Sequence, residues 1–355
     1  MIASADLDAC REMIRTGSYS FHAASRLLPE RVRAPSLALY AFCRVADDAV
    51  DEAVNDGQRE EDAEVKRRAV LSLRDRLDLV YGGRPRNAPA DRAFAAVVEE
   101  FEMPRALPEA LLEGLAWDAV GRSYDSFSGV LDYSARVAAA VGAMMCVLMR
   151  VRDPDVLARA CDLGLAMQLT NIARDVGTDA RSGRIYLPRD WMEEEGLPVE
   201  EFLARPVVDD RIRAVTHRLL RAADRLYLRS EAGVCGLPLA CRPGIYAARH
   251  IYAGIGDEIA RNGYDSVTRR AFTTRRQKLV WLGLSATRAA LSPFGPGCAT
   301  LHAAPEPEVA FLVNAAARAR PQRGRSEALI SVLAQLEAQD RQISRQRLGN
   351  RANPI

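Results

Sequence analysis

Lysine is nearly missing from this 355-residue sequence: of its 49 basic side chains, only Lys66 and Lys278 are lysines. The formal net charge of +2 is too small for the overall charge to indicate a nucleic-acid partner. Histidine is also scarce, and none of the four histidines forms a pair at the helical spacing of a metal site. The composition therefore argues against a nucleic-acid-binding protein and against a histidine-based zinc centre.

The cysteine patterns that stabilise small secreted folds are missing as well. The seven cysteines are an odd number, form no CxxC motif, and several stand in apolar runs where a thiol packs as a small hydrophobe. This usage argues against a disulfide framework and is typical of a reducing compartment. The first eight residues lack the basic and apolar regions of a signal peptide. We therefore expect a cytoplasmic protein.

Long hydrophobic runs are absent too. The longest apolar run, Val137 to Met149, has 13 residues and is bounded by Arg136 and Arg150. A membrane-spanning helix needs about 20 consecutive, predominantly apolar residues. The sequence therefore predicts no transmembrane segment.

What the chain does contain is helical periodicity along nearly its whole length, whereas the alternating pattern of strands is scarce. With 48% hydrophobic residues, the chain is long enough to bury a sizeable core. The predicted fold is all-α, a single large helical bundle around a central apolar cavity. The expected helices are 5–16, 20–28, 34–54, 60–81, 90–101, 107–120, 128–151, 155–180, 188–195, 198–204, 208–232, 238–262 and 268–290.

The last part of the chain departs from this pattern. We expect the bundle to occupy residues 1–290, followed by an irregular proline-rich insertion over 291–325 around a short helix at 308–319. Residues 326–355 predict an amphipathic helix, from 326 to 348, and a basic tail. This helix either docks on the bundle, which we favour, or lies on an anionic membrane surface as a peripheral contact. The sequence leaves the oligomeric state open.

The most informative stretch runs from Gln168 to Pro188, where Asp175 and Asp179 stand four residues apart. In a helix this spacing puts both carboxylates on one face, with Asn171 and Gln168 on the preceding turns. Like charges one turn apart repel, so a cation between them would stabilise the arrangement. Magnesium takes oxygen ligands and usually binds through one or two carboxylates together with substrate phosphates. The alternative is the solvated polar face of a helix.

A second acidic pair favours the metal site. Asp47 and Asp51 repeat the four-residue spacing, with Arg44 and Tyr40 on the preceding turns. Both pairs lie in otherwise apolar helical segments, where acids are seldom buried unless they are paired or bind a metal. We expect the two helices to face each other, with all four aspartates at the mouth of the cavity as ligands of a metal cluster.

These motifs resemble the two aspartate-rich motifs of the squalene and phytoene synthase family, the head-to-head isoprenoid synthases. The resemblance rests on Asp-Asp-Ala-Val-Asp at 47–51 and Asp-Val-Gly-Thr-Asp at 175–179. The longer run from Arg174 to Pro188, which contains Gly177, is similar to the phytoene synthase form of the second motif. The resemblance covers about residues 15–290 and implies a helical bundle of the isoprenoid synthase type.

The resemblance implies a prenyltransferase that joins two geranylgeranyl diphosphate molecules into phytoene, the first committed step of carotenoid biosynthesis. It implies a cyclopropyl (prephytoene) diphosphate intermediate, Mg²⁺ as cofactor with Mn²⁺ as a substitute, and no nicotinamide cofactor. Tyr40 or the released diphosphate would accept a proton. Two alternatives stay open: a squalene or dehydrosqualene synthase that uses farnesyl diphosphate, and a non-catalytic scaffold or assembly relative of the same fold.

Further site residues follow from the resemblance. Ser20 and Phe21 match a loop that lines the diphosphate end of the pocket, with an ordinary loop before a helix as the alternative. Gly17 and Tyr19 depart from the family pattern in this loop. Tyr133 opens a segment of small residues that would leave room for a prenyl tail, or would only allow close helix packing. The residues expected to hold the diphosphates are Arg44, Gln168, Asn171, Tyr252 and Arg269, with Arg270 as the alternative to Arg269.

Overall fold

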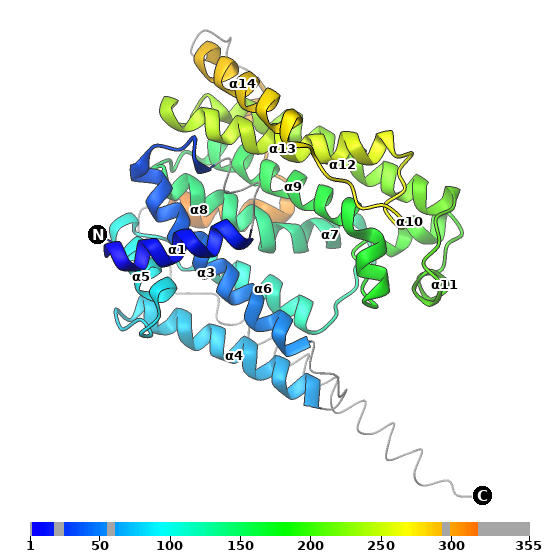
Figure 1. The fold of residues 1–355 in the computed structure, drawn as a ribbon, viewed down its shortest axis with the longest axis horizontal. Helices are drawn as coiled ribbons and strands as arrows, with labels where there is room; N and C mark the ends of the chain where they lie inside the picture. Colours follow the sequence, from blue (N-terminus) through cyan, green and yellow to red (C-terminus); the bar gives the residue numbers. More distant parts are fainter. Residues whose placement is uncertain (1, 18–24, 55–60, 293–298, 319–355) are drawn as a thin grey trace, which may run out of the picture.

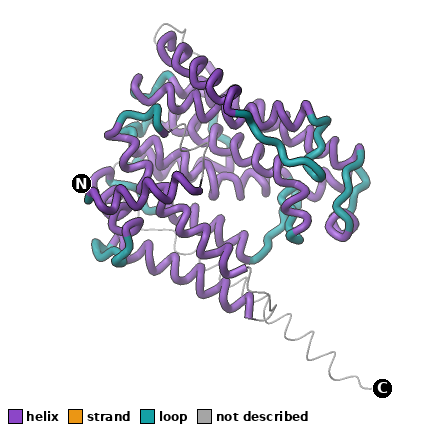
Figure 2. The backbone as a smooth tube through the Cα atoms, in the orientation of Figure 1, coloured by secondary structure: helices purple, strands orange, loops and turns teal. Residues whose placement is uncertain are grey.

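A computed structural model of the protein describes residues 2–17, 25–54, 61–292 and 299–318. Within its helices, the side chains at 47, 49–54, 61–67 and 69 also lie outside the described set. Every regular element in the described ranges is a helix, and Figure 2 shows no strand there. The prediction of an all-α fold is confirmed.

The helices follow one another in the order given by their labels in Figure 1. The first are α1 (Ser4–Gly17), α3 (Glu30–Val54), α4 (Glu61–Tyr81), α5 (Pro89–Phe101) and α6 (Ala106–Ala119). A continuous helix comes next, made of α7 (Phe127–Ser134), a π-helical turn η1 (Ala135–Ala139) and α8 (Ala140–Leu148). The second half has α9 (Pro154–Arg181), α10 (Arg189–Glu194), α11 (Val199–Ala204), α12 (Asp210–Val234), η2 (Leu239–Cys241), α13 (Arg242–Arg261) and α14 (Arg275–Leu291). The last described elements are η4 (Ala299–His302), η5 (Pro307–Val309) and α15 (Ala310–Ala317).

Helix α9 is the centre of the bundle, because it packs against α8, α12, α13, α15 and η1 (Figure 1). Its start is fixed by Asp153, whose carboxylate accepts the backbone N–H groups of Asp155 and Val156. Pro154 occupies the first turn, where its missing N–H costs nothing. The chain leaves the helix at Gly183, whose φ of 71° is easily adopted only by glycine. Local sequence therefore sets both ends of the helix that carries the second acidic motif.

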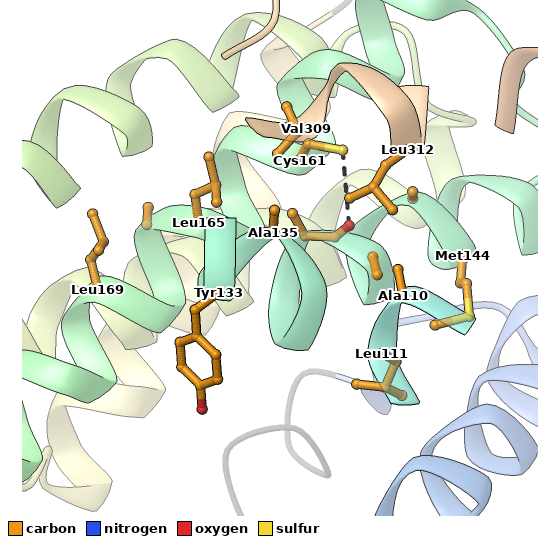
Figure 3. Close-up of a cluster of buried hydrophobic side chains, with 14 of the residues drawn as sticks. Ala110, Leu111, Tyr133, Ala135, Met144, Cys161, Leu165, Leu169, Val309 and Leu312 are labelled. Atoms are coloured by element: carbon orange, nitrogen blue, oxygen red, sulfur yellow. Dashed lines mark hydrogen bonds between the residues drawn. The ribbon is translucent and has the colours of Figure 1, made fainter. Parts of the chain in front are cut away.

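The core extends beyond residue 290, where the sequence analysis placed the end of the bundle. Figure 3 shows Val309 and Leu312 close to Cys161 and Leu165 of α9, and all four side chains are shielded from solvent. They belong to the hydrophobic core that the other helices share. The segment 299–317 therefore closes the bundle around α9, and α15 corresponds to the short helix expected at 308–319.

The continuous helix from Phe127 to Leu148 is longer than the apolar run that the sequence analysis measured. By its 22 residues and its composition it is long and apolar enough to cross a membrane. However, 67% of its most apolar stretch is buried inside the bundle, where α8 and η1 pack against α6 and α9. A helix in the core of a protein can be equally long and apolar, and this helix lies in the core.

One predicted helix begins later in the structure, and two others lie mostly or wholly outside the described residues. The helix predicted over 268–290 begins only at Arg275, because Thr274 and Gln277 form a capping box that starts a helix there. Residues 267–274 form an irregular connection instead. Most of the helix predicted over 20–28, and all of the helix predicted over 326–348, fall outside the described residues.

Candidate active site

A cavity of about 1000 Å³ lies between α3, α6, α8, α9, α12 and α13. Its volume is at the upper end of the range of about 300–1,000 Å³ that small-molecule sites occupy. One wall is a stripe of α9: Val156, Arg159, Ala160, Leu163, Gly164, Met167, Gln168, Asn171, Arg174 and Asp175. Its first half is apolar except for Arg159, which pairs with Asp162 at 2.9 Å, and its second half is polar. From Ala160 to Asp175 the helix rises about 22 Å. The cavity therefore has one apolar end and one polar end.

The carboxylate of Asp175 is held between two arginines at the polar end. Arg270 donates from Nε to Oδ1 at 2.7 Å, and Arg174 donates from Nε to the same oxygen at 3.0 Å. Burial alone would raise the pKa of Asp175, but the hydrogen bonds from Arg174 and Arg270 outweigh it and lower the pKa below its ordinary value. Asp175 is therefore ionised at neutral pH.

Asp179 follows one turn later and has a different electrostatic environment. Burial, reinforced by the charge of Asp175, raises the pKa of Asp179 to about 7. A divalent cation between the two carboxylates would relieve their repulsion, and both offer only oxygen atoms, which magnesium prefers. Asp179 does not line the cavity, whereas Asp175 does. The donor chemistry of the second acidic motif therefore fits a magnesium site.

The first acidic motif lies on α3, which forms another wall of the cavity. Tyr40 and Arg44 line the cavity, and Arg44 pairs with Asp48 at 2.5 Å. The register of α3 puts positions 47 and 51 on the helix face that carries Arg44. The side chains of Asp47 and Asp51 lie outside the described set. Among the side chains that are described, no three His, Cys, Asp or Glu converge, and the four-aspartate cluster stays a prediction.

Three further predicted substrate residues line the cavity. Gln168 and Asn171 stand one turn apart on α9, and the Asn171 amide donates to Gln168 Oε1 at 3.3 Å. Tyr252 reaches the cavity from α13, and burial raises the pKa of its hydroxyl, which stays protonated. The three side chains together offer hydrogen-bond donors and acceptors to a ligand.

Arg269 and Arg270 take different positions although they are neighbours in sequence. Both are exposed, but Arg269 is not among the residues that line the cavity. Arg270 lines the cavity and binds Asp175. The geometry therefore favours Arg270, the alternative in the sequence analysis, for a contact with phosphate.

Gly177 explains how the loop that carries Arg270 can reach α9. The Gly177 N–H donates to the carbonyl of Ser266 at 2.9 Å, and a Cβ at position 177 would lie only 2.6 Å from the Cα of Val267. One turn later, Arg181 donates to the carbonyl of Val267 at 3.0 Å. Any side chain at 177 would push this loop away from the helix. Gly177, which is part of the family resemblance, is therefore needed for the close packing of this loop on α9.

Asp118 of α6 is a site residue that the sequence analysis missed. Its two carboxylate oxygens accept the hydroxyl groups of Tyr133 at 2.9 Å and Tyr186 at 2.8 Å. Burial, followed by the charge of Asp118, raises the pKa of both tyrosines, so both stay protonated and donate. Asp118 and Tyr133 line the cavity. The only signal in the sequence is a single acid in the apolar run from Leu115 to Val120.

The small residues after Tyr133 lie partly at the cavity and partly between packed helices. Ala138 and Gly142 line the cavity, and because a Cβ at position 142 would lie only 2.7 Å from the carbonyl oxygen of Ala160, Gly142 also allows close packing on α9. Ala139 and Ala143 are fully buried in the packing between helices. This part of the helix therefore borders the cavity and also packs closely on its neighbours.

The predicted N-terminal loop is described only at its edges. Ser20 and Phe21 fall in the range 18–24, which lies outside the described residues. Ser25 and Leu28, which come directly after that range, line the cavity. The chain therefore enters the cavity wall just after the loop, and the roles of Ser20 and Phe21 stay predictions.

Comparisons with known proteins agree on one group. A profile of the squalene/phytoene synthase family matches residues 14–278. The chain is 64% identical over 345 residues to a phytoene synthase of Rhodobacter capsulatus, a match that covers 96% of this chain and 98% of the relative. It is 42% identical over 282 residues to a 15-cis-phytoene synthase of a Paracoccus species, covering 77% and 88%. Among solved structures, a dehydrosqualene synthase in complex with a ligand is similar with a TM-score of 0.71 and 29% identity, covering 81% of this chain and 97% of that chain.

Proposed function

Because the chain belongs to the squalene/phytoene synthase family, we propose that it joins two molecules of geranylgeranyl diphosphate head to head into phytoene. In the first half of the reaction, one substrate ionises and the double bond of the other attacks it, which gives a cyclopropyl diphosphate after proton loss. In the second half, this intermediate ionises, rearranges and loses a further proton. The product is a hydrocarbon, and the reaction is the first committed step of carotenoid biosynthesis.

One observation carries the proposal, namely that the cavity joins a charged end to an apolar channel. Asp175 and Arg270 stand at the charged end, and Met167, Gly164 and Ala160 continue the same wall into the apolar half. A prenyl diphosphate has the same division, with a charged head and a hydrocarbon tail. The cavity volume of about 1000 Å³, at the upper end of the range for small-molecule sites, suits a large ligand.

Oxygen ligands for magnesium would come from both acidic motifs, that is, from Asp47, Asp51, Asp175 and Asp179. When bound, Mg²⁺ or Mn²⁺ supplies Lewis-acid stabilisation of the departing diphosphate. Phytoene formation consumes no reductant, so the reaction needs no nicotinamide cofactor.

Basic and amide side chains would orient the two diphosphates. Arg270 offers a planar fork of donors that matches phosphate oxygens, and Arg44 lines the cavity from α3. Gln168, Asn171 and the protonated hydroxyl of Tyr252 add neutral hydrogen bonds. Holding both heads in this way puts the reacting carbons close together, which lowers the entropic cost of the reaction.

The apolar half of the cavity would keep water away from the carbocations. Asp118, whose charge also acts on Asp179 at the polar end, is proposed as a positioning residue, because it fixes the hydroxyl groups of Tyr133 and Tyr186 by accepting a hydrogen bond from each. Tyr40, which lines the cavity, and the released diphosphate are the proposed proton acceptors.

Product analysis tests the proposal. The purified full chain is incubated with geranylgeranyl or farnesyl diphosphate, each with and without Mg²⁺ and NADPH, and the hydrocarbon is identified by mass spectrometry. We expect phytoene from geranylgeranyl diphosphate and Mg²⁺ alone. Dehydrosqualene or squalene from farnesyl diphosphate as the only product would assign the shorter substrate instead. No hydrocarbon, combined with no rise in melting temperature on adding Mg²⁺ and an unreactive prenyl diphosphate analogue, would assign a scaffold.

A further inference from the structure

A buried arginine borders the apolar half of the cavity. Arg159 of α9 lines the cavity there, and its side chain is fully shielded from solvent. It forms an ion pair with Asp162, one turn later on α9, with Nε 2.9 Å from Oδ2, and Asp162 is fully buried as well. Taking two charges out of water is costly unless they are paired and hydrogen-bonded. The chemistry proposed for the polar end of the cavity does not use this pair.

The further partners of Arg159 belong to the segment 299–306, whose helix η4 packs against α9 and α12. Arg159 donates from Nη1 to the carbonyl of Thr300 at 2.6 Å and from Nη2 to the carbonyl of Ala304 at 3.4 Å. Arg229 of α12 donates from Nη2 to the carbonyl of Ala304 at 2.9 Å. Two arginines on different helices therefore fix the backbone of this segment.

Two acids complete this arrangement. Asp162 accepts from Arg229 Nε at 3.1 Å, and Glu306 of the segment pairs with Arg229. Burial raises the pKa of Asp162 to about 6 against the charges of Arg159 and Arg229, so the carboxylate is mainly ionised at pH 7. We call Arg159, Asp162, Arg229 and Glu306 the ion cluster. It joins the cavity wall to a part of the chain beyond residue 278, where the match to the family profile ends.

The stem of Arg159 is held as firmly as its guanidinium. Gly233 of α12 lies so close that a Cβ there would be only 2.3 Å from Arg159 Cβ and 2.9 Å from Arg159 Cγ. The guanidinium binds Thr300 and Ala304, neither of which lines the cavity. The aliphatic stem is therefore the part of the side chain left to border the cavity, beside Val156 of the same helix.

Arg159 lies at a distance from the polar end that matches one substrate length. Helix α9 rises about 24 Å between Arg159 and Asp175. The fifteen backbone bonds of an extended geranylgeranyl chain span about 18 Å, at the roughly 1.2 Å per bond of an extended chain. About 6 Å is then left for the diphosphate and its metal ions. One further isoprene unit would add about 5 Å and would meet Arg159.

We propose that Arg159, held by the segment 299–306 through the ion cluster, closes the apolar end of the cavity and limits the length of the prenyl tail that the cavity accepts. The proposal rests on the proposed function for the substrate class. Arg159 determines substrate length and takes no part in bond making, since it lies far from the reacting carbons next to the diphosphate. The segment 299–306 thus shapes the substrate site although its residues do not line the cavity.

Binding of unreactive prenyl diphosphate analogues tests the limit without requiring turnover. Thiolodiphosphates with tails of 15, 20 and 25 carbons are titrated against the full chain in the presence of Mg²⁺. We expect the 20-carbon analogue to bind more tightly than the 15-carbon analogue, because it buries more apolar surface. The 25-carbon analogue should bind at least about tenfold more weakly than the 20-carbon analogue. Equal or tighter binding of the 25-carbon analogue to the wild type would overturn the proposal.

Two variants test the ion cluster. Arg159→Met removes the guanidinium and leaves a flexible, unbranched side chain, so binding of the 25-carbon analogue should improve at least about tenfold relative to the 20-carbon analogue. Arg229→Gln acts only through the segment, because Arg229 does not line the cavity. It should shift the same ratio in the same direction by about threefold, and it decides the question where Arg159→Met does not fold.

The control variant is His302→Gln, which changes the same segment without touching the ion cluster. His302 pairs with Asp155, and the two side chains are 71% and 43% exposed. This substitution should leave the ratio of the two affinities unchanged. If Arg159→Met and Arg229→Gln lower the melting temperature but also leave the ratio unchanged, the ion cluster only stabilises the fold and the proposal fails.

Product analysis separates this proposal from the proposed function. A wild-type protein that binds the analogues with the expected length limit, but forms no hydrocarbon from geranylgeranyl diphosphate, would refute the proposed reaction and support the length limit. A protein that forms phytoene, but binds the 20- and 25-carbon analogues equally well, would support the reaction and refute the length limit.

Discussion

The guanidinium of Arg270 binds the carboxylate of Asp175 although 95 residues separate them in the sequence, with Nε 2.7 Å from Oδ1. This contact joins the loop after α13 to the second acidic motif on α9. It places the proposed phosphate-binding group of Arg270 and the proposed metal ligand Asp175 at the same end of the cavity.

Removing the guanidinium of Arg270 should impair the enzyme far more than removing that of its neighbour. A hydrogen bond to a charged group contributes about 1.5–3 kcal/mol, so Arg270→Gln should lower kcat/KM by about 10- to 150-fold. The matched variant Arg269→Gln should stay close to wild type, because Arg269, which is exposed like Arg270, does not line the cavity. Steady-state kinetics with both variants decides the matter. Equal losses would show that the exposed arginine also reaches the diphosphate.

Neutralising Asp175 should abolish turnover while the protein stays folded. Asp175→Asn removes a metal ligand in the proposed mechanism but keeps the size of the side chain. Circular dichroism should show native helix content, and hydrocarbon formation should fall to background. Asp125→Asn is the control, because the side chain of Asp125 is 96% exposed and lies away from the acid pair in sequence. Near-normal activity of Asp175→Asn would contradict the assignment of the motif.

Asp118 and Tyr133 should act as one unit. Asp118→Asn leaves one of the two tyrosine hydroxyls without its carboxylate acceptor, a loss of about 1–3 kcal/mol for a buried group. We therefore expect kcat to fall by roughly 5- to 150-fold, with KM changing less. In a double-mutant cycle, Tyr133→Phe should cost much less in the Asp118→Asn background than in the wild type. Strictly additive effects of the two substitutions on kcat would show that Asp118 does not act through Tyr133.

Alanine substitutions at two glycines should change the stability of the protein in different directions. Gly177→Ala forces a methyl group against Val267, an overpacking that costs about 1–3 kcal/mol in stability. It should also lower activity, because the displaced loop carries Arg270. Gly283→Ala, in the middle of α14 with open space around it, should be neutral or stabilise by up to about 1 kcal/mol. Urea unfolding measures both values. A Gly177→Ala variant as stable and active as the wild type would mean that the loop tolerates the shift.

Stability should fall as the pH drops below neutrality because of His250. Burial, together with the charges of Arg249 and Arg288, lowers the pKa of His250 from 6.5 to about 4. Between these values the unfolded chain binds a proton that the folded protein does not, so the free energy of unfolding decreases with falling pH. The loss amounts to at most about 3 kcal/mol by pH 4.

Urea unfolding between pH 7 and pH 4.5 measures this effect. His250→Gln should flatten the pH dependence, because glutamine does not titrate. The matched control is His217→Gln, at a histidine whose side chain is exposed on α12. An unchanged slope in His250→Gln would assign the acid sensitivity to other groups.

Much of the helical framework could be predicted because helix ends depend on local signals. The prediction of 155–180 for α9 agrees with the observed Pro154–Arg181, since Asp153, Pro154 and Gly183 act on their immediate neighbours. The start of α14 was wrong by seven residues, because the periodicity of residues 268–274 is compatible with a helix that the capping box at Thr274 excludes. The role of α15 in the core depends on packing against a helix more than a hundred residues earlier.

By itself, the sequence determined the helical class and the polar stripe of Gln168, Asn171 and Asp175, because helical periodicity alone puts residues three and four apart on one face. Only the tertiary structure decided that Arg270 and not Arg269 binds Asp175, and that Asp118 holds two tyrosines beside the cavity. These contacts join side chains from different helices and loops. Their partners depend on how the helices pack, and no local pattern along the chain encodes that packing.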